Sequence, residues 1–318
     1  MANDADAPIF SAVSSSARQL FLLLRCISFA PKATVRISPE GIRFSVEETS
    51  VMEEHDLADE LPPPPTFQIS LPALLETLQI FTLNDAASKS SGEPYDAFTA
   101  ARLNRHANQP FSSSVLGTSG LCRLSYQGPG SALSVHLTEA GVSTTCDLTT
   151  YESSWGEEDI PFDRDSLTLK TIMRSTHLAD AVTELASANP TTLSLLVNPE
   201  RAPHLSLSAT GPLGSATVEF ARDPQLLETF QCERRFSSSY KFALVKAAQR
   251  AMTSATKVSL RTDEQGVLSL QFLIEVEAGG LGGEGIAFVD FRIVPLVEGE
   301  GEAGVRGGGE SGESTDDE

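Results

Sequence analysis

The stretch "FQISLPALLETL" (67–78) returns in altered form 173 residues later as "YKFALVKAAQRAM" (240–252). In both stretches an alternating strand pattern runs directly into apolar residues spaced i, i+3, i+4 and i+7, the spacing of one helix face. The corresponding apolar positions are Phe67, Ile69, Leu71, Leu74, Leu75 and Leu78 in the first stretch, and Tyr240, Phe242, Leu244, Ala247, Ala248 and Ala251 in the second. A unit repeated at this distance predicts a duplicated fold.

Other stretches of the chain also resemble one another, at offsets that differ from 173. "RISPEGIRFSVEE" (36–48) resembles "LSLLVNPERAPHLSLSA" (193–209), since both read as two strands around a turn, and "LSVHL" at 133 resembles "LSLQF" at 268. Apolar residues at helical spacing also follow Ala17 and Leu178, ahead of the strands in each half. We therefore predict an α+β fold of two duplicated domains, each with two helices packed on antiparallel sheets.

Changes in amino-acid composition along the chain predict where these domains begin and end. We expect an N-terminal domain over 1–150 that carries a surface insertion at about 84–114, rich in Ser, Ala and Asn. An acidic, proline-containing connector follows over 151–166, and the second domain spans 167–297. The tail over 298–318 holds eight acids and one base and is predicted to be disordered.

Charge and cysteine content exclude several classes of protein. The 43 acidic and 23 basic residues give a net charge of −20, which argues against a freestanding nucleic-acid binder. The four cysteines form no C-x-x-C pair and are expected to be reduced thiols of an intracellular protein. The acidic N-terminus lacks a secretory signal, and the longest apolar run (Leu20 to Leu24) is too short for a membrane span, so no membrane contact is expected.

No stretch carries a convincing catalytic or cofactor motif. "GLGGEG" (280–285) matches G-x-G-x-x-G, but strand patterns lie on both sides of it, so we interpret it as a hairpin loop. The five histidines are scattered, no G-x-S-x-G stretch is present, and the acidic runs read as solvated loops. We therefore predict no catalytic residue, no metal and no cofactor.

Basic residues gather on the predicted helices. Arg18 and Arg25 lie off the apolar face of the first helix, Lys246 and Arg250 lie off that of the last, and Arg174 opens the third. Each helix by itself has the composition of an ordinary solvated face. Their placement on corresponding helices of an otherwise acidic chain instead favours contact with a phosphate backbone.

The chain resembles the PCNA-like DNA sliding clamps, and within them the family of the Rad-one subunit of the nine-one-one DNA-damage checkpoint clamp. The resemblance covers about residues 9 to 297. It rests on "GIRFSVEE" (41–48), "FQISLPALLETLQIF" (67–81), "EAGVSTTCDL" (139–148), "LADAVTELASA" (178–188) and "KVSLRTDEQGVLSLQFLIE" (257–275). It implies a ring of three chains, with sheets outside and helices lining a channel for double-stranded DNA.

The resemblance also implies roles for particular residues. The channel-facing bases would be Arg18, Arg25, Arg174, Lys246 and Arg250. The strands 141–150 and 215–220 would be the edges that meet two different clamp subunits, through Val142, Thr144, Cys146, Leu148, Thr217 and Val218. An apolar groove for partner peptides would contain Val51, Ile160, Pro161, Phe162 and Pro295. The second helix departs from this pattern, because it offers Glu76 and Gln79 and no base.

From this resemblance we expect a non-catalytic, nuclear subunit of a heterotrimeric clamp. A clamp loader would place it on damaged DNA, where it would serve checkpoint kinase signalling and repair proteins. Three alternatives stay open: a 3′–5′ DNA exonuclease, a homotrimeric processivity clamp for a polymerase, and a duplicated scaffold that binds only proteins.

Overall fold

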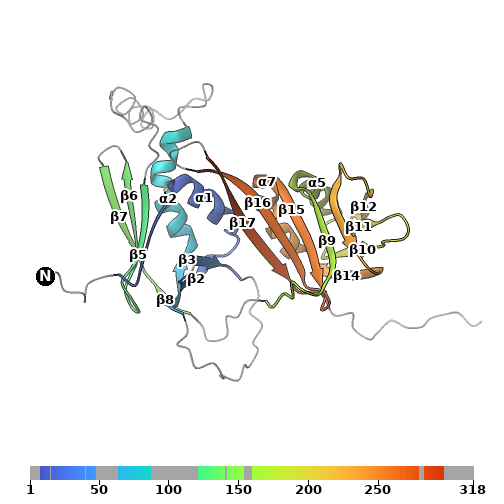
Figure 1. Cartoon of the computed structure of the whole chain (residues 1–318), viewed down its shortest axis with the longest axis horizontal. Helices are drawn as coiled ribbons and strands as arrows, with labels where there is room; N and C mark the ends of the chain where they lie inside the picture. Colours follow the sequence, from blue (N-terminus) through green and yellow to red (C-terminus); the bar gives the residue numbers. More distant parts are fainter. Residues whose placement is uncertain are drawn as a thin grey trace, which may run out of the picture.

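The described residues of the N-terminal half form two sheets and two helices, which Figure 1 shows in blue to green. The computed structural model describes residues 8–14, 16–39, 41–47, 64–86, 121–139, 142–153, 160–278 and 283–296. The elements of this half are β1 (Phe10–Ser14), α1 (Ala17–Cys26), β2 (Lys32–Ser38), β3 (Gly41–Ser45), β4 (Thr66–Ser70), α2 (Leu71–Ala86), β5 (Leu121–Tyr126), β6 (Leu133–Glu139), β7 (Val142–Leu148) and β8 (Tyr151–Glu152). They form the sheets β1-β5-β6-β7 and β3-β2-β4-β8.

The C-terminal half repeats this plan with additional strands. Its elements are β9 (Leu167–Arg174), α5 (Ser175–Ala186), β10 (Thr192–Val197), β11 (Leu205–Gly211), β12 (Gly214–Phe220), β13 (Leu227–Cys232), β14 (Phe236–Lys241), α6 (Phe242–Ala247), α7 (Gln249–Ser254), β15 (Lys257–Asp263), β16 (Leu268–Ala278) and β17 (Gly283–Ile293). Its sheets are β13-β9-β15-β16-β17 and β12-β11-β10-β14.

The order of the strands confirms the predicted duplication. The run β1-β5-β6-β7 corresponds to β9-β15-β16-β17, and β3-β2-β4 corresponds to β11-β10-β14. In both halves a strand leads directly into a helix, at Ser70–Leu71 and at Lys241–Phe242. All strand pairs in the described part of the chain are antiparallel. The α+β class predicted from the repeats is therefore correct.

Local sequence explains where the N-terminal helices begin. Ser16 caps α1, since its Oγ accepts a hydrogen bond of 3.3 Å from the backbone N–H of Gln19. Ser70 does the same for α2 by accepting from the N–H of Ala73 at 3.4 Å. Both helices then bury leucines, with Leu24 of α1 only 4% exposed and Leu74 of α2 fully buried. Helix positions in this half thus follow directly from capping serines and apolar spacing.

Each half has a hydrophobic core of its own. The N-terminal core lies between α1, α2 and the two sheets, with Val35, Ile69 and Val135 fully buried. The C-terminal core is built in the same way from α5, α7 and the sheet strands, around Met173, Val182 and Phe272. None of the helices in the described segments is long and apolar enough to cross a membrane.

The structure changes three local predictions. The last helix is not continuous, because Ala248 (φ −75°, ψ −1°) separates α6 from α7. Helix α2 continues to Ala86, so the first residues of the expected insertion at 84–114 are helical. Only part of the glycine-rich stretch can be a loop, since Gly283 already pairs with Ala278 in the β16–β17 hairpin. The remainder of the insertion, the tail over 298–318 and residues 154–159 of the connector lie outside the described residues.

Candidate DNA-binding surface and subunit edges

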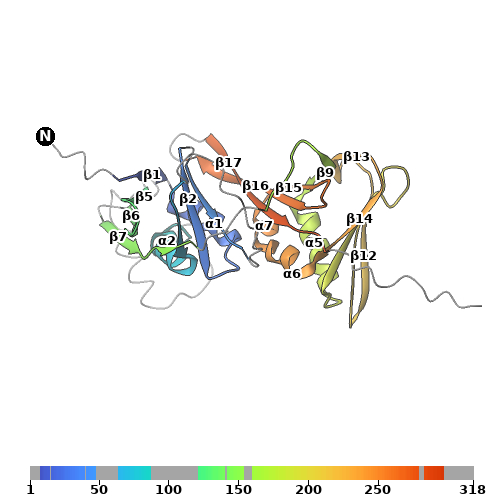
Figure 2. The ribbon, with the colours of Figure 1, turned by 90° about the horizontal axis from the view of Figure 1, so that it is seen from below.

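The helices follow one another along the long axis of the molecule. Figure 2 shows the sequence α2, α1, α7, α6 and α5 from one end to the other. Packing contacts join α2 to α1, α1 to α7, and α7 to α5, so the row is continuous through the middle of the chain. The exposed residues of these helices therefore determine the charge of one extended surface.

Helix α1 places two of the predicted DNA-facing residues on its exposed side. Arg18 and Arg25 are both exposed, whereas Ala17, Leu24 and Cys26 on the opposite side are buried. Arg25 lies in the last turn, where its positive charge also interacts favourably with the helix dipole. The seven-residue spacing brings both guanidinium groups to the same side of the helix, two turns apart.

Helix α1 also connects the two halves. Its last residue, Cys26, is 2% exposed and belongs to the core of the C-terminal half, with Leu23 and Ile27 packed against that core. Burial raises the pKa of the Cys26 thiol, against the smaller opposing influence of a hydrogen bond with Ser254 and of the nearby Arg25 and Arg250 charges. Helix α1 is therefore shared by both hydrophobic cores.

Arg250 lies at this junction. Its Nη1 donates a hydrogen bond to Ser28 Oγ, and Ser28 Oγ in turn donates to the carbonyl of Arg25 at 2.9 Å. Next to this bond, the rings of Phe29 and Phe291 lie 6.2 Å apart across the boundary between the halves. The structure thus brings Arg25 and Arg250 together, although they are far apart in the sequence.

The other two predicted DNA-facing residues lie farther along the row of helices. Lys246 is exposed near the end of α6, on the other side of the break at Ala248 from Arg250. Arg174 is exposed at the end of β9 and is the N-cap residue of α5. Between these bases the exposed side chains of α5 include Asp180 and Glu184. The basic surface is consequently concentrated at α1 and α7.

Two free sheet edges carry the predicted interface residues. Strand β7 ends the sheet β1-β5-β6-β7, and β12 ends the sheet β12-β11-β10-β14. Both strands have seven residues and the same sequence of exposed, half-buried and buried positions. The predicted interface residues occupy them as follows: Val142 and Thr217 are exposed, Thr144, Cys146 and Val218 are half-buried, and Leu148 is buried.

The connector is fixed to the outer face of the largest sheet. Arg292 Nη1 donates a 2.6 Å hydrogen bond to the carbonyl of Ile160, and the guanidinium carbon of Arg261 lies 5.4 Å from the centre of the Phe162 ring. Burial lowers the pKa of Arg261, partly offset by the charge of Asp290. These contacts hold two of the predicted groove residues against β15 and β17.

The turn between β15 and β16 brings the connector close to the end of β17. The backbone N–H of Asp163 donates to Oδ2 of the buried Asp263 at 3.3 Å. Gly266, in the same turn, lies beside Pro295, since a Cβ built on this glycine would be 3.3 Å from Pro295 Cγ. Phe162 and Pro295 therefore flank one turn, with Pro161 exposed next to them. Val51, the remaining predicted groove residue, lies outside the described residues.

An apolar patch beside this region was missed by the sequence analysis. Ile286 and Phe288 on β17 are 60% and 58% exposed, and Phe288 pairs with the half-buried Leu273 of β16. The signal was present in "GIAFVDF", where apolar residues occupy both alternating faces of the strand. This pattern is typical of a strand that has apolar surroundings on both sides.

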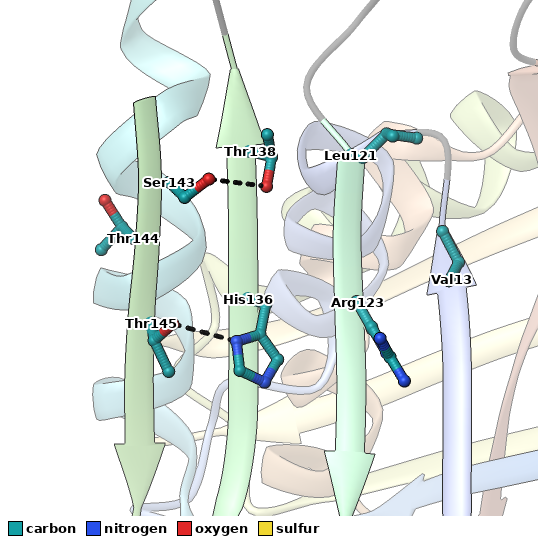
Figure 3. Close-up of a pocket in the computed structure, with 8 residues that line it drawn as sticks. All are labelled: Val13, Leu121, Arg123, His136, Thr138, Ser143, Thr144 and Thr145. Atoms are coloured by element: carbon teal, nitrogen blue, oxygen red, sulfur yellow. Dashed lines mark hydrogen bonds between the residues drawn. The ribbon is translucent and has the colours of Figure 1, made fainter. Parts of the chain in front are cut away.

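The outer face of the sheet β1-β5-β6-β7 is polar instead. A shallow hollow of about 380 Å³ lies there, lined by Val13, Leu121, Arg123, His136, Thr138, Ser143, Thr144 and Thr145. Figure 3 draws these eight side chains. Side-chain hydrogen bonds join neighbouring strands, with His136 Nδ1 2.9 Å from Thr145 Oγ1 and Thr138 Oγ1 3.3 Å from Ser143 Oγ. No carboxylate lines the hollow, so it lacks the ligands that metal-dependent phosphodiester cleavage requires.

Comparison with known proteins identifies the family. The family described as "Repair protein Rad1/Rec1/Rad17" matches residues 9–58 and 53–274. The chain belongs to this family. The "DNA damage checkpoint control protein rad1" of Schizosaccharomyces pombe is 30% identical over 304 residues, covering 91% of this chain and 87% of that protein. The "Cell cycle checkpoint protein RAD1" of Mus musculus is 31% identical over 294 residues, covering 88% and 90%.

One relative in the family is named for an activity. The "DNA repair exonuclease REC1" of Mycosarcoma maydis is 27% identical over 293 residues, covering 73% of this chain and 63% of that protein. Among the described residues of this chain, no three His, Cys, Asp or Glu side chains gather to hold a metal ion.

Solved structures confirm the clamp fold. The complex of PCNA2 and PCNA3 from Sulfolobus tokodaii superimposes with a TM-score of 0.58 at 14% identity, covering 90% of this chain and 99% of the other. At this identity the likeness concerns the fold alone. It establishes that a chain of the Rad1 family adopts the PCNA-like clamp architecture, as the resemblance had implied.

Proposed function

We propose that this chain is a non-catalytic subunit of a heterotrimeric, ring-shaped checkpoint clamp that encircles DNA and recruits signalling and repair proteins. The observation that carries this proposal is the pair of free edge strands, β7 and β12, which have the same length and burial pattern in a duplicated clamp fold. An unpaired strand edge promotes association. A chain with one such edge on each half is suited to bind one neighbour at each end.

The two edges differ in side chains, so the chain would join its neighbours head to tail, with unlike edges in contact. β7 offers Thr144 and Cys146 at the positions where β12 offers Ala216 and Val218. Contacts between unlike surfaces close into a ring when the rotation between chains is right. The matched solved structure is itself a complex of two different clamp chains, PCNA2 and PCNA3. The partners proposed here are the two other clamp subunits of a nine-one-one complex.

Solution mass tests the assembly directly. Light scattering of the purified chain is expected to give the mass of a monomer, 33.9 kDa. With both other clamp subunits present, it should give a stable one-to-one-to-one complex. A trimer of the chain alone would instead favour the homotrimeric processivity clamp. A monomer that binds neither subunit would contradict the ring.

The helix bases supply the proposed contact with DNA. Arg18, Arg25 and Arg250 gather on α1 and α7, and Lys246 and Arg174 extend the row, so duplex DNA in the channel would meet them through its phosphates. Such contacts are independent of sequence, and each one neutralised changes the slope of log K against log salt by about 0.9. A scaffold that binds only proteins would tolerate the change of Arg18, Arg25, Lys246 and Arg250 to Glu. The proposed clamp would instead be loaded less efficiently onto DNA when these bases are changed to Glu.

Partner peptides are proposed to dock on the outer face near the connector. Ile160, Pro161, Phe162 and Pro295 surround the β15–β16 turn, and Ile286 and Phe288 add exposed apolar surface on β17 of the same sheet. Apolar surface bordered by charged residues is typical of protein-binding sites. Repair and checkpoint proteins would bind here after a clamp loader, which would supply the ATP-driven step, has placed the ring on DNA in the nucleus.

A nuclease is the second candidate, and it rests on the name of the Mycosarcoma maydis relative. It predicts metal-dependent release of nucleotides from 3′ ends by the pure chain. Incubation with labelled duplex DNA and Mg²⁺ or Mn²⁺ tests this, alone and within the heterotrimer. The clamp proposal expects no release above that of the Arg18→Glu, Arg25→Glu variant. Cleavage that co-purifies with the chain and disappears when a single carboxylate is changed would overturn it.

A further inference from the structure

The hairpin between β11 and β12 presents an unusually exposed leucine. Leu213 is 76% exposed, more than any other large apolar side chain in the described part of the chain. It occupies the second position of a two-residue turn, since Gly211 and Gly214 on either side are paired across the hairpin. Directly after this turn begins β12, an edge strand of the sheet β12-β11-β10-β14. The leucine therefore stands at the start of a surface proposed to bind a neighbour.

The turn is held rigidly against the loop after α5. The backbone N–H of Leu213 donates a 3.4 Å hydrogen bond to the carbonyl of Ala188. Gly211 packs so closely on the same loop that a Cβ at this position would lie 2.2 Å from the Ala188 carbonyl oxygen. Gly214 has a φ of +132°, a backbone conformation that favours glycine, and Pro212 has a fixed φ. Only the side chain of Leu213 extends from this fixed backbone.

A rigid backbone increases the contribution that an exposed leucine can make to binding affinity. Single exposed apolar residues are common on protein surfaces and usually need no explanation. A flexible turn would lose conformational entropy on binding, whereas a turn already held in place loses little, so its apolar side chain contributes more to affinity. Leu213 combines a fixed backbone with a position directly before an edge strand, and it is the most exposed large apolar side chain among the described residues.

We infer that Leu213 is an anchor of the β12 interface, filling an apolar pocket on the neighbouring clamp subunit beside the end of that subunit's edge strand. This inference rests on the proposed function, because it requires a neighbour at β12. Every strand pair in the described structure is antiparallel, and an antiparallel continuation sets the first residues of β12 opposite the last residues of the neighbour's edge strand.

The chain's own second edge shows what chemistry that pocket would have. At the end of β7 lies Leu148, 9% exposed, followed by Tyr151, 46% exposed with Lys32 Nζ 5.1 Å from its ring centre. The proposal requires the neighbour to present a comparable apolar surface at the end of its own edge strand. A leucine side chain fits such a pocket, whereas a charged side chain would be buried there without a partner.

Two variants of Leu213 and one matched control test this inference. The heterotrimer is assembled with the wild-type chain, with Leu213→Asp and with Leu121→Asp. Leu121 is 52% exposed on β5, an interior strand, and serves as the control. The dissociation constant is measured separately for each of the two other clamp subunits. Leu213→Asp should weaken binding of one subunit at least tenfold and leave the other unchanged. Leu121→Asp should stay within twofold of wild type for both.

A photocrosslinking residue gives an independent measurement of the same contact. In the assembled heterotrimer, Leu213→p-benzoylphenylalanine should crosslink to the single subunit whose binding Leu213→Asp weakens, while the same substitution at Leu121 should crosslink to neither. A heterotrimer that forms but shows neither crosslink nor weakened binding would overturn the inference and leave the proposed function standing. If the wild-type chain forms no heterotrimer, the proposed function fails, and the anchor role fails with it.

Discussion

Helix α2 and the pair α6–α7 occupy equivalent places in the two halves, yet they are built differently. α2 is one helix of 16 residues that buries Leu71, Leu74 and Leu78. α6 and α7 are short segments separated at Ala248; α6 buries Phe242 and Val245, and α7 buries Ala251 and Met252. α2 packs on α1 and its sheets. α7 packs on α1, α5 and β16 together. Small side chains let α7 approach all three neighbours, and the duplicated helix has thereby become the connection between the halves.

The largest expected effect comes from giving α2 the small residue of its counterpart. Leu78 is fully buried and corresponds to Ala251, so Leu78→Ala leaves a cavity that the leucine filled. We expect the free energy of unfolding to fall by about 2–5 kcal/mol. Denaturant titration monitored by circular dichroism measures it. Ile80→Ala on the same helix, 38% exposed in the wild type, is the control and should cost much less. Equal losses would show that α2 is loosely packed.

The reverse exchange tests whether α7 requires a small residue. Ala251 is fully buried between helices, so Ala251→Leu should overpack the junction and lower the free energy of unfolding by about 1–3 kcal/mol. The exposed Ala243 of α6 provides the control, because Ala243→Leu has room in solvent. The free energy of unfolding of both variants is measured by thermal unfolding and compared with that of the wild type. A neutral Ala251→Leu would mean that the alanines do not determine the approach of α7 to α1 and α5.

A buried thiol in the core of the N-terminal half should make the free energy of unfolding depend on pH in the alkaline range. Burial raises the pKa of Cys122 on β5 from 9.0 to about 11. The folded thiol therefore keeps its proton between pH 9 and 11 while the unfolded chain releases it, so stability declines over this window. The slope from this thiol is about 1.4 kcal/mol per pH unit at most. The Cys122→Ala variant should lose stability less steeply there than wild type. Identical slopes would contradict a buried, protonated Cys122.

The smallest expected effect concerns the hydrogen bond that joins Arg250 of α7 to Ser28 beyond the end of α1. Ser28→Ala removes the acceptor of the Arg250 hydrogen bond across the junction. Both groups are exposed, so the loss should be about 0.5 kcal/mol, the lower end for a hydrogen bond. A double-mutant cycle with Arg250→Gln isolates the coupling. A coupling energy indistinguishable from zero would show that Arg250 remains available to DNA without any link to α1.

Much of this fold could be predicted from the sequence, because the two halves repeat the same local strand and helix patterns of apolar residues. The sequence repeat pairs Phe67 with Tyr240, and both lie in strands that lead directly into a helix. The pairing is two residues out of register at the helix start, because Ile69 still lies in β4 whereas Phe242 is the first residue of α6. The break at Ala248 could not be predicted, because the stretch 240–252 contains no glycine or proline to signal it. The burial of Cys26 in the opposite core and the contact of Arg250 with Ser28 are tertiary facts.

The candidate site was predicted less completely for a related reason. Exposure of Arg18 and Arg25 follows from helical spacing, which local sequence contains. Exposure of Leu213, Ile286 and Phe288 does not, because an apolar residue in a strand or turn looks like a core residue until the sheet edges are known. The roles of the proposed DNA-facing, interface and groove residues stay predictions until the assembly is measured.

The passage of α1 from one core into the other has a mechanical consequence. Bending the chain at its middle would withdraw Cys26, Leu23 and Ile27 from the C-terminal core and separate Phe29 from Phe291. The two halves should therefore move together as a single stiff arc. If three such arcs form a ring, the compliant points are the strand contacts between chains, and a gap wide enough to admit DNA would open there.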